Sequence, residues 1–160
     1  MKLTAKGRYA VMALSDLARH STGHPIPLAE IAERQDISLS YLEQLFAKLR
    51  RAGLVTSVRG PGGGYRLAQP AARTRVADII LAVDEPVETN RCTPAQPCGC
   101  KDSTIQCLTH GLWEQLGNQI YLYLSAVTIA DVIEQRMVPP QSPDPHTDAP
   151  GPEGSSPEPA

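Results

Sequence analysis

The chain has 160 residues, of which 41% are hydrophobic and only 4% aromatic, so we expect one domain with an appendage and a mostly aliphatic core. Its net charge of −2 hides an asymmetry: residues 1–75 hold 12 Lys and Arg against 5 Asp and Glu, a net +7, whereas residues 76–160 hold 3 against 12, a net −9. A basic first half favours an anionic partner. The first apolar run is interrupted at Ser15 and Asp16, too short for a signal peptide or a membrane span, which predicts a cytoplasmic protein without membrane association.

Three helices are predicted in the basic half. Thr4 can cap the first, in which apolar residues recur every three or four positions. A short helix follows at 28–34, and the sequence QDIS then makes a turn. The third helix begins near Ser38 or Ser40 and ends at Gly53, with an apolar stripe formed by Leu42, Leu45, Phe46 and Leu49.

Two short strands are predicted after the third helix. Residues 54–59 (LVTSVR) and 65–68 (YRLA) flank the stretch GPGGG, which is typical of a tight turn. This stretch lacks the Gly-Lys-Ser/Thr ending of a phosphate-binding loop and does not open a helix, so a nucleotide site is not expected. Helix, turn, helix and ribbon is the order of a winged helix-turn-helix, which predicts that residues 1–75 bind DNA with the third helix in the major groove.

The polar face of the third helix carries residue types that contact DNA. Gln pairs with adenine, Glu accepts from cytosine, Ser contacts bases or phosphate, and Lys or Arg binds phosphate. Glu43 has a second interpretation, because Ser40-x-x-Glu43 is also the pattern of a capping box, and Lys48 also fits a solvated face. Arg59 and Arg66 flank the glycine-rich tip, either as DNA contacts or as ordinary turn residues. The candidate DNA contacts on the helix are Ser40, Tyr41, Glu43, Gln44 and Lys48, with Arg50 and Arg51 adding charge.

The second half is predicted to contain a short helix at 76–85, a cysteine-rich stretch, a long helix and a short last helix opened by Thr128 or Asp131. The long helix repeats apolar residues at Leu112, Leu116, Ile120, Leu124 and Val127, and either forms a dimer interface or packs within one chain. Residues 139–160 hold 8 of the 15 prolines, which predicts a disordered tail. The predicted units are therefore 1–75, 76–138 and 139–160.

All four cysteines and one histidine lie between Cys92 and His110, which makes five candidate ligands within 19 residues. Clustered cysteines in a reducing compartment indicate a metal site before a disulfide. The spacing typical of structural zinc, C-x2–4-C, is absent, but three cysteines and one histidine suit zinc or an iron–sulfur cluster. Thiols that bind nothing are the remaining alternative. The candidates are Cys92, Cys98, Cys100, Cys107 and His110.

The chain contains the segments LTAKGRYAVMAL, PLAEIAERQDISLSYLEQLFAKLRRAGLVTSVRGPGGGYRL, AVDEPVETNRC and CLTHGLW. Together they closely resemble the IscR family of bacterial iron–sulfur cluster regulators, over residues 1 to about 135. The resemblance implies a mainly α fold with a small β-ribbon, a long dimerisation helix, and a homodimer that binds pseudo-palindromic DNA and is not an enzyme. It also implies a [2Fe–2S] cluster, with cluster-assembly proteins as donors, and repression of cluster-assembly genes when clusters are plentiful. Cluster-bound and cluster-free forms would both bind DNA, with different site preferences.

The resemblance also implies roles for single residues. The implied ligands are Cys92, Cys98, Cys107 and His110, the implied base-reading residues are Ser40, Glu43 and Gln44, and Arg59 is the implied wing contact. One feature departs from the family pattern C-x5-C-x5-C-x2-H, because eight residues separate Cys98 from Cys107 and Cys100 is additional. Cys100 is therefore an alternative second ligand. Two other functions stay open: a nitric oxide or iron sensor of the wider family with a [4Fe–4S] cluster, and a redox or electron-transfer protein.

Overall fold

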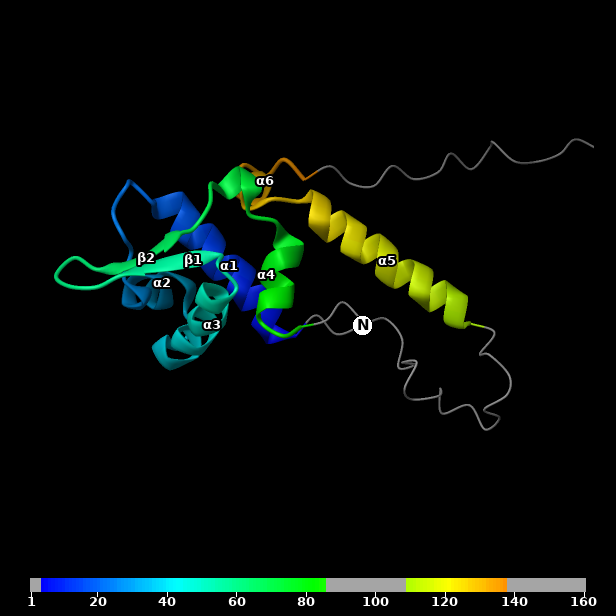
Figure 1. Cartoon of the computed structure of the whole chain (residues 1–160), viewed down its shortest axis with the longest axis horizontal. Helices are drawn as coiled ribbons and strands as arrows, with labels where there is room; N and C mark the ends of the chain where they lie inside the picture. Colours follow the sequence, from blue (N-terminus) through cyan, green and yellow to red (C-terminus); the bar gives the residue numbers. More distant parts are fainter. Residues whose placement is uncertain (1–3, 86–108, 138–160) are drawn as a thin grey trace, which may run out of the picture.

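A computed structural model describes residues 4–85 and 109–137. Its elements are, in chain order, α1 (Ala5–His20), α2 (Leu28–Gln35), α3 (Leu39–Arg51), β1 (Val55–Val58), β2 (Gly64–Leu67), η1 (Ala71–Arg73), α4 (Val76–Ala82), α5 (His110–Ala126) and α6 (Ile129–Ile133). Figure 1 shows α1 to α4 and α6 grouped with the β-ribbon, while α5 extends away from this group. The prediction of a mainly helical fold with one small ribbon is confirmed.

The core is aliphatic and is organised around α1. This helix contacts α2, α3, α4, α6 and β2, and Ala10, Ala13, Leu14 and Leu17 on it are fully buried. Phe46 of α3 is also fully buried, with its ring 4.9 Å, centroid to centroid, from the ring of Tyr65 on β2. Burial of each large apolar side chain stabilises the fold by roughly 1.5–3 kcal/mol, so the apolar stripes of the sequence hold α3 and the ribbon on α1.

Capping side chains decide where the helices begin. The Oγ1 atom of Thr4 accepts from the Lys6 N–H at 3.3 Å, and the Oγ atom of Ser38 accepts from the Tyr41 N–H at 3.3 Å. Of the two predicted starts for α3, Ser38 is therefore the cap, and Ser40 lies inside the first turn. The alternative interpretation of Ser40 and Glu43 as a capping box is wrong, because Ser38 already occupies the capping position.

The ribbon is held by a third segment of the chain. β1 pairs antiparallel with β2, with Val55 opposite Leu67 and Val58 opposite Gly64. The Ile26 N–H donates to the Tyr65 carbonyl at 2.9 Å, and the Tyr65 N–H donates to the Ile26 carbonyl at 2.8 Å. A Cβ atom at Gly64 would collide with the Ile26 backbone, so glycine is required here by close backbone approach.

Of the 17 residues of α5, only Gly117 is buried. The apolar stripe predicted from the sequence is divided, since Leu112 and Leu116 are exposed whereas Ile120, Leu124 and Val127 are half-buried. The end of α5 is attached to the domain, because the Val76 N–H donates to the Val127 carbonyl at 2.9 Å. No helix within residues 4–85 and 109–137 is long and apolar enough to cross a membrane.

Candidate nucleic-acid interface and ligand segment

The connection between α2 and α3 is short and sharply turned. Asp36, which ends α2, has the left-handed backbone conformation with a φ of 52°, and its N–H donates to the Ala32 carbonyl. Ile37 is buried, and Ser38 then caps α3. Residues 36–38 therefore join α2 and α3 as a helix-turn-helix, in which the second helix is the one presented to DNA.

The exposed face of α3 carries the predicted base-reading residues. Ser40, Glu43 and Gln44 are all exposed, and their spacing of three and four residues places them on one side of the helix. None of the three side chains forms a hydrogen bond or ion pair within the described parts of the chain. Tyr41 differs, because its half-buried ring meets Tyr9 of α1 edge-on at 5.9 Å between ring centroids. Its ring therefore packs α3 against α1, whatever else it contacts.

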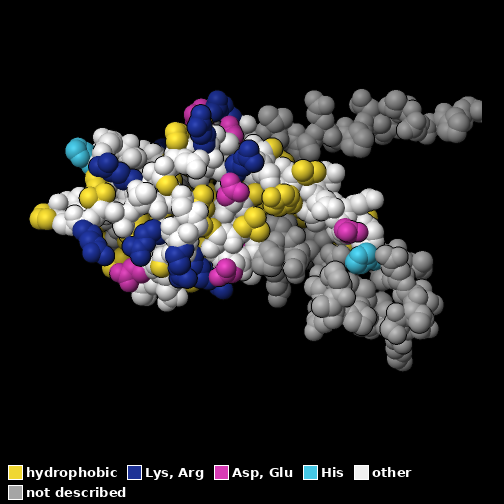
Figure 2. Space-filling view, in the orientation of Figure 1, with side chains coloured by type: hydrophobic (Ala, Val, Ile, Leu, Met, Phe, Trp, Pro, Cys, Tyr) yellow, Lys and Arg dark blue, Asp and Glu magenta, His cyan; other side chains and the backbone are white. Residues whose placement is uncertain are grey.

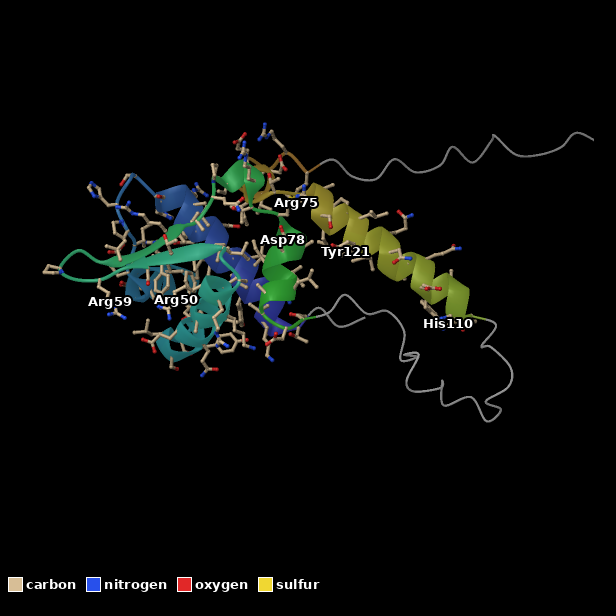
Figure 3. All side chains as sticks on the ribbon, in the orientation of Figure 1. Arg50, Arg59, Arg75, Asp78, His110 and Tyr121 are labelled. Atoms are coloured by element: carbon tan, nitrogen blue, oxygen red, sulfur yellow. The ribbon has the colours of Figure 1, made fainter. Side chains whose placement is uncertain are left out.

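Basic side chains surround this face. Figure 2 shows several Lys and Arg side chains gathered over the side of the molecule that holds α3 and the β-ribbon. Figure 3 places Arg59 on the loop between β1 and β2, and Arg50 on α3. The Arg50 Nη1 atom lies 3.4 Å from the Oγ atom of Ser57 on β1. A basic rim of this kind suits the phosphates on either side of a groove.

Lys48, a predicted phosphate contact, is held by a partner that sequence reasoning missed. Its Nζ atom lies 2.7 Å from the Oδ2 atom of Asp84, which follows α4. The hydrogen bond from Lys48 and the charge of this ammonium lower the pKa of Asp84 below its ordinary value. Because 36 residues separate the two, no local pattern in the sequence relates them.

Glu85 is a second acidic residue that sequence reasoning missed. Only 5% of it is exposed, and its carboxylate accepts from the backbone N–H groups of Thr4 and Gly7. These N–H groups belong to the start of α1, where helical amides lack intrahelical partners and the helix dipole favours a negative charge. A Cβ atom at residue 7 would lie 2.6 Å from Oε2 of Glu85, so the close approach of this carboxylate requires glycine.

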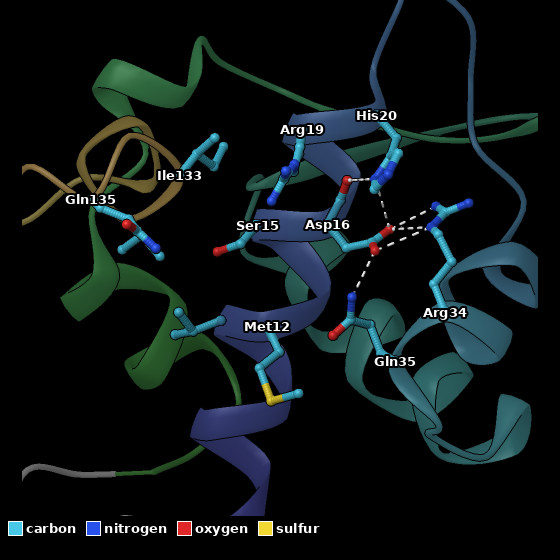
Figure 4. A pocket seen from close by; sticks show the side chains of 11 residues that line it. Met12, Ser15, Asp16, Arg19, His20, Arg34, Gln35, Ile133 and Gln135 are labelled. Atoms are coloured by element: carbon cyan, nitrogen blue, oxygen red, sulfur yellow. Dashed lines mark hydrogen bonds and ion pairs between the residues drawn. The ribbon is translucent and has the colours of Figure 1, made fainter.

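A buried carboxylate also fixes α2, and with it the helix-turn-helix, on α1. Asp16 of α1 accepts from Arg34 Nη2 at 2.6 Å and from Gln35 Nε2 at 2.7 Å, and His20 Nδ1 lies 3.5 Å from its Oδ1. Figure 4 shows this cluster beside a groove of about 600 Å³ that is bounded by α1, α2 and the region of α6. Burial raises the pKa of Asp16, but the hydrogen bonds from Arg34 and Gln35 outweigh burial, so the net pKa lies below its ordinary value.

His110 is the one predicted cluster ligand that the structure describes. It is the first residue of α5, 23% of its side chain is exposed, and its Nε2 atom lies 4.0 Å from the Glu114 carboxylate. Figure 3 shows it at the end of α5 that is far from the ribbon. An imidazole at a helix N-terminus suits a net-negative, thiolate-rich group, so this residue fits the predicted cluster.

The other predicted ligands, Cys92, Cys98, Cys107 and the alternative Cys100, lie outside the described residues. Within the parts of the chain that are described, no group of three or more His, Cys, Asp or Glu could hold a metal ion. The predicted ligand set and the DNA-contacting roles therefore stay predictions.

A helix-turn-helix followed by a β-ribbon, with a polar face on its second helix and a basic rim, defines the winged helix-turn-helix class of DNA-binding proteins. Residues 3–135 match the Rrf2 family of iron-dependent transcriptional regulators. The chain belongs to this family.

Named relatives agree with this assignment. The putative HTH-type transcriptional regulator ORF2 of Azotobacter vinelandii is 56% identical over 133 residues, which cover 83% of this chain and 79% of the relative. The HTH-type transcriptional regulator IscR of Photorhabdus laumondii is 51% identical over 138 residues, 86% of this chain and 82% of the relative. The solved structure of T. potens IscR superposes with a TM-score of 0.67 at 38% identity and covers 85% of this chain and 88% of that one. The predicted resemblance is confirmed, and the protein is a transcriptional regulator, not an enzyme.

Proposed function

We propose that this protein is a homodimeric DNA-binding regulator that senses cluster supply through a [2Fe–2S] cluster and represses the genes of cluster assembly. The observation that carries the proposal is the position of His110. This candidate ligand is the first residue of α5, and the other end of α5 is attached to the domain by the hydrogen bond from the Val76 N–H to the Val127 carbonyl. Glu85, which precedes residues 86–108 in the chain, is bound to the start of α1. These two attachments support a link between the cysteine-containing segment and the DNA-binding unit.

In this proposal Cys92, Cys98, Cys107 and His110 hold the cluster, with Cys100 as the alternative to Cys98. Thiolates together with an imidazole are donors that [2Fe–2S] centres use. The cluster, when bound, supplies an iron group whose presence depends on cellular supply, and cluster-assembly proteins are its proposed donors. The chain itself supplies the net-negative donor set and the N-terminus of α5 beside it.

The homodimer is proposed to form through α5. This helix exposes Leu112, Trp113, Leu116, Tyr121, Leu122 and Tyr123, far more apolar surface than a solvated helix of one chain ordinarily presents. A twofold dimer presents two copies of α3 to two half-sites, so the operator is expected to be pseudo-palindromic. Ser40, Glu43 and Gln44 are proposed to read bases, with Tyr41, Lys48 and Arg59 supporting contact with the backbone.

The test of the cluster is anaerobic purification followed by metal and sulfide analysis and electron paramagnetic resonance of the reduced protein. We expect about two iron and two sulfide per chain, as in a [2Fe–2S] centre. Cys92→Ala, Cys107→Ala and His110→Ala are expected to lose the cluster, whereas Cys100→Ala, the matched control, retains it. One zinc per chain would contradict the cluster and leave DNA binding intact. About four iron per chain would favour the second candidate function, a nitric oxide or iron sensor. This function is also consistent with a family of iron-dependent regulators.

A further inference from the structure

Two acidic residues, Asp84 and Glu85, follow α4 and are here called the junction. Their backbone is fixed to α4, since the Asp84 N–H donates to the Leu81 carbonyl at 3.1 Å and the Glu85 N–H donates to the Ile80 carbonyl at 3.3 Å. Asp84 has a φ of 57°, the left-handed conformation that commonly ends a helix. The two side chains reach different elements, with Asp84 binding α3 and Glu85 binding α1.

Glu85 anchors this junction on α1. Its buried carboxylate accepts two N–H groups that the helix itself leaves without partners. Removing the carboxylate would leave buried donors unsatisfied, which is costly. The position of residue 85 is therefore coupled to the first turn of α1.

Asp84 connects the junction to α3, the second helix of the helix-turn-helix. Lys48 lies one turn after Gln44 on α3, and its ammonium bonds to the Asp84 carboxylate. The carboxylate is 76% exposed, and an exposed ion pair of this kind contributes little by itself. A DNA phosphate can therefore compete with Asp84 for Lys48. Which of the two binds the Lys48 ammonium depends on the position of Asp84 relative to α3.

We propose that Asp84 and Glu85 are positioning residues that couple residues 86–108 to DNA affinity, with Asp84 competing against DNA phosphate for Lys48. This inference rests on the proposed function in two respects: Lys48 contacts DNA, and the segment after Glu85 carries the cluster. Seated on α1 through Glu85, the junction keeps the Lys48 charge neutralised. When the junction shifts, Lys48 becomes available to the backbone.

The first test is a double-mutant cycle on DNA binding, measured over a series of salt concentrations. Asp84→Asn removes the charge, while asparagine still accepts the left-handed backbone. We expect it to tighten binding to random duplex DNA several-fold at low salt and to steepen the slope of log K against log salt by about 0.9, the value for one phosphate contact. The matched control is Asp78→Asn on α4, which removes the same charge from an exposed residue and is expected to leave the slope unchanged.

Lys48→Ala completes the cycle. We expect it to weaken binding more in the Asp84→Asn protein than in the unaltered one. Equal weakening in both backgrounds would overturn the inference about Asp84 and leave the DNA contact of Lys48 standing. No weakening in either background would remove Lys48 from the proposed DNA interface and overturn this inference with it, while the cluster and the dimer would be unaffected.

The second test concerns Glu85 and uses the full-length protein, with its cluster and after removal of the cluster by a chelator. Glu85→Gln keeps the size of the side chain and removes its charge. We expect the ratio of DNA affinities between the two forms to move toward one, a readout that general destabilisation does not produce, while thermal unfolding identifies a variant that fails to fold. An unchanged ratio in a folded variant would overturn the role of Glu85. If the variant does not fold, the Asp84 cycle decides the proposal.

Discussion

At the scale of single residues, a buried ion pair positions the helix-turn-helix on α1. The side chain of Asp16 is 1% exposed and its partner Arg34 is 31% exposed. The net pKa of Asp16 lies below its ordinary value, so the ionised carboxylate stabilises the folded state. This stabilisation is complete above the pKa of the unfolded chain and is lost as the pH falls through the lower folded pKa.

We expect Arg34→Met to lower the free energy of unfolding by about 3 kcal/mol, because it leaves the Asp16 carboxylate buried without its main partner. Urea unfolding measures the change. Arg19→Met is the matched control, since Arg19 is exposed and a surface substitution changes stability by about 0.5 kcal/mol or less. In the unaltered protein we expect stability to decline below about pH 4, where Asp16 of the unfolded chain begins to bind a proton while that of the folded protein stays ionised. An equal loss in both variants would contradict the role given to the ion pair.

Gln44 and Arg59 are expected to act on DNA in different ways. Gln44→Ala should cost about 1–3 kcal/mol at the operator and leave binding to random DNA unchanged, because a bidentate base contact discriminates between sequences. Arg59→Ala should weaken binding to all sequences and reduce its salt dependence, as the loss of a phosphate contact does. Titration of operator and random duplexes at several salt concentrations separates the two. If Gln44→Ala weakened both duplexes equally, Gln44 would not be a base reader.

At the scale of elements, the predicted apolar stripe of α5 is exposed at one end of the helix and half-buried at the other. Its C-terminal half carries the half-buried Ile120 and Leu124, and its last residues are joined to the domain through Val127. Its N-terminal half exposes Leu112 and Leu116. A second copy of the chain is the occupant that we propose for the exposed stripe.

We expect Leu116→Glu to convert the proposed dimer to a monomer, since a charge in an apolar interface is costly. Sedimentation velocity measures the change in mass, and operator affinity should fall with it because two half-sites are no longer read together. Asn118→Glu introduces the same side chain at an exposed position on another side of the helix and should remain dimeric. A Leu116→Glu protein that sediments with the mass of the unaltered dimer would exclude α5 as the interface.

At the scale of the whole molecule, His110 lies away from the apolar core of the described residues. The buried apolar residues within the described ranges belong to α1, α2, α3, α4, α6, β1 and the segments between them. His110, the one predicted ligand that the structure describes, is at the far end of α5 (Figure 3). We therefore expect the DNA-binding unit to keep its packing when the proposed cluster is lost.

Removal of the cluster by a chelator is expected to change DNA binding without unfolding the domain. Helical content from far-ultraviolet circular dichroism should fall little, because α1 to α4 and α6 pack through a core of buried apolar side chains. The ratio of affinities for different operators should change, because Glu85 and Asp84, which precede residues 86–108 in the chain, bind α1 and α3. Cooperative loss of helical signal on chelation would instead show that the cluster is a folding element, as in small metal-dependent domains.

Much of the fold follows from local patterns. The stripe from Leu42 to Leu49, the cap at Thr4 and the end of α3 at Gly53 are read within a few residues, because helical periodicity and capping are short-range effects. The start of α3 is ambiguous in the sequence, since Ser38 and Ser40 are both good caps, and in the structure Ser38 is the cap. The choice between Cys98 and Cys100 stays a prediction.

The sequence by itself determined that this protein has a winged helix-turn-helix, a polar face on the helix after the turn, and a cluster of cysteines ahead of a long apolar helix. These features depend on spacing along the chain, and spacing is visible in the sequence. Only the tertiary structure decided that Lys48 binds Asp84, 36 residues away, and that Glu85 binds the start of α1, 78 residues from Gly7. The physical reason is that the packing of α4 against α1 and α3 brings these partners together, and no local pattern encodes a contact between elements so far apart in the chain.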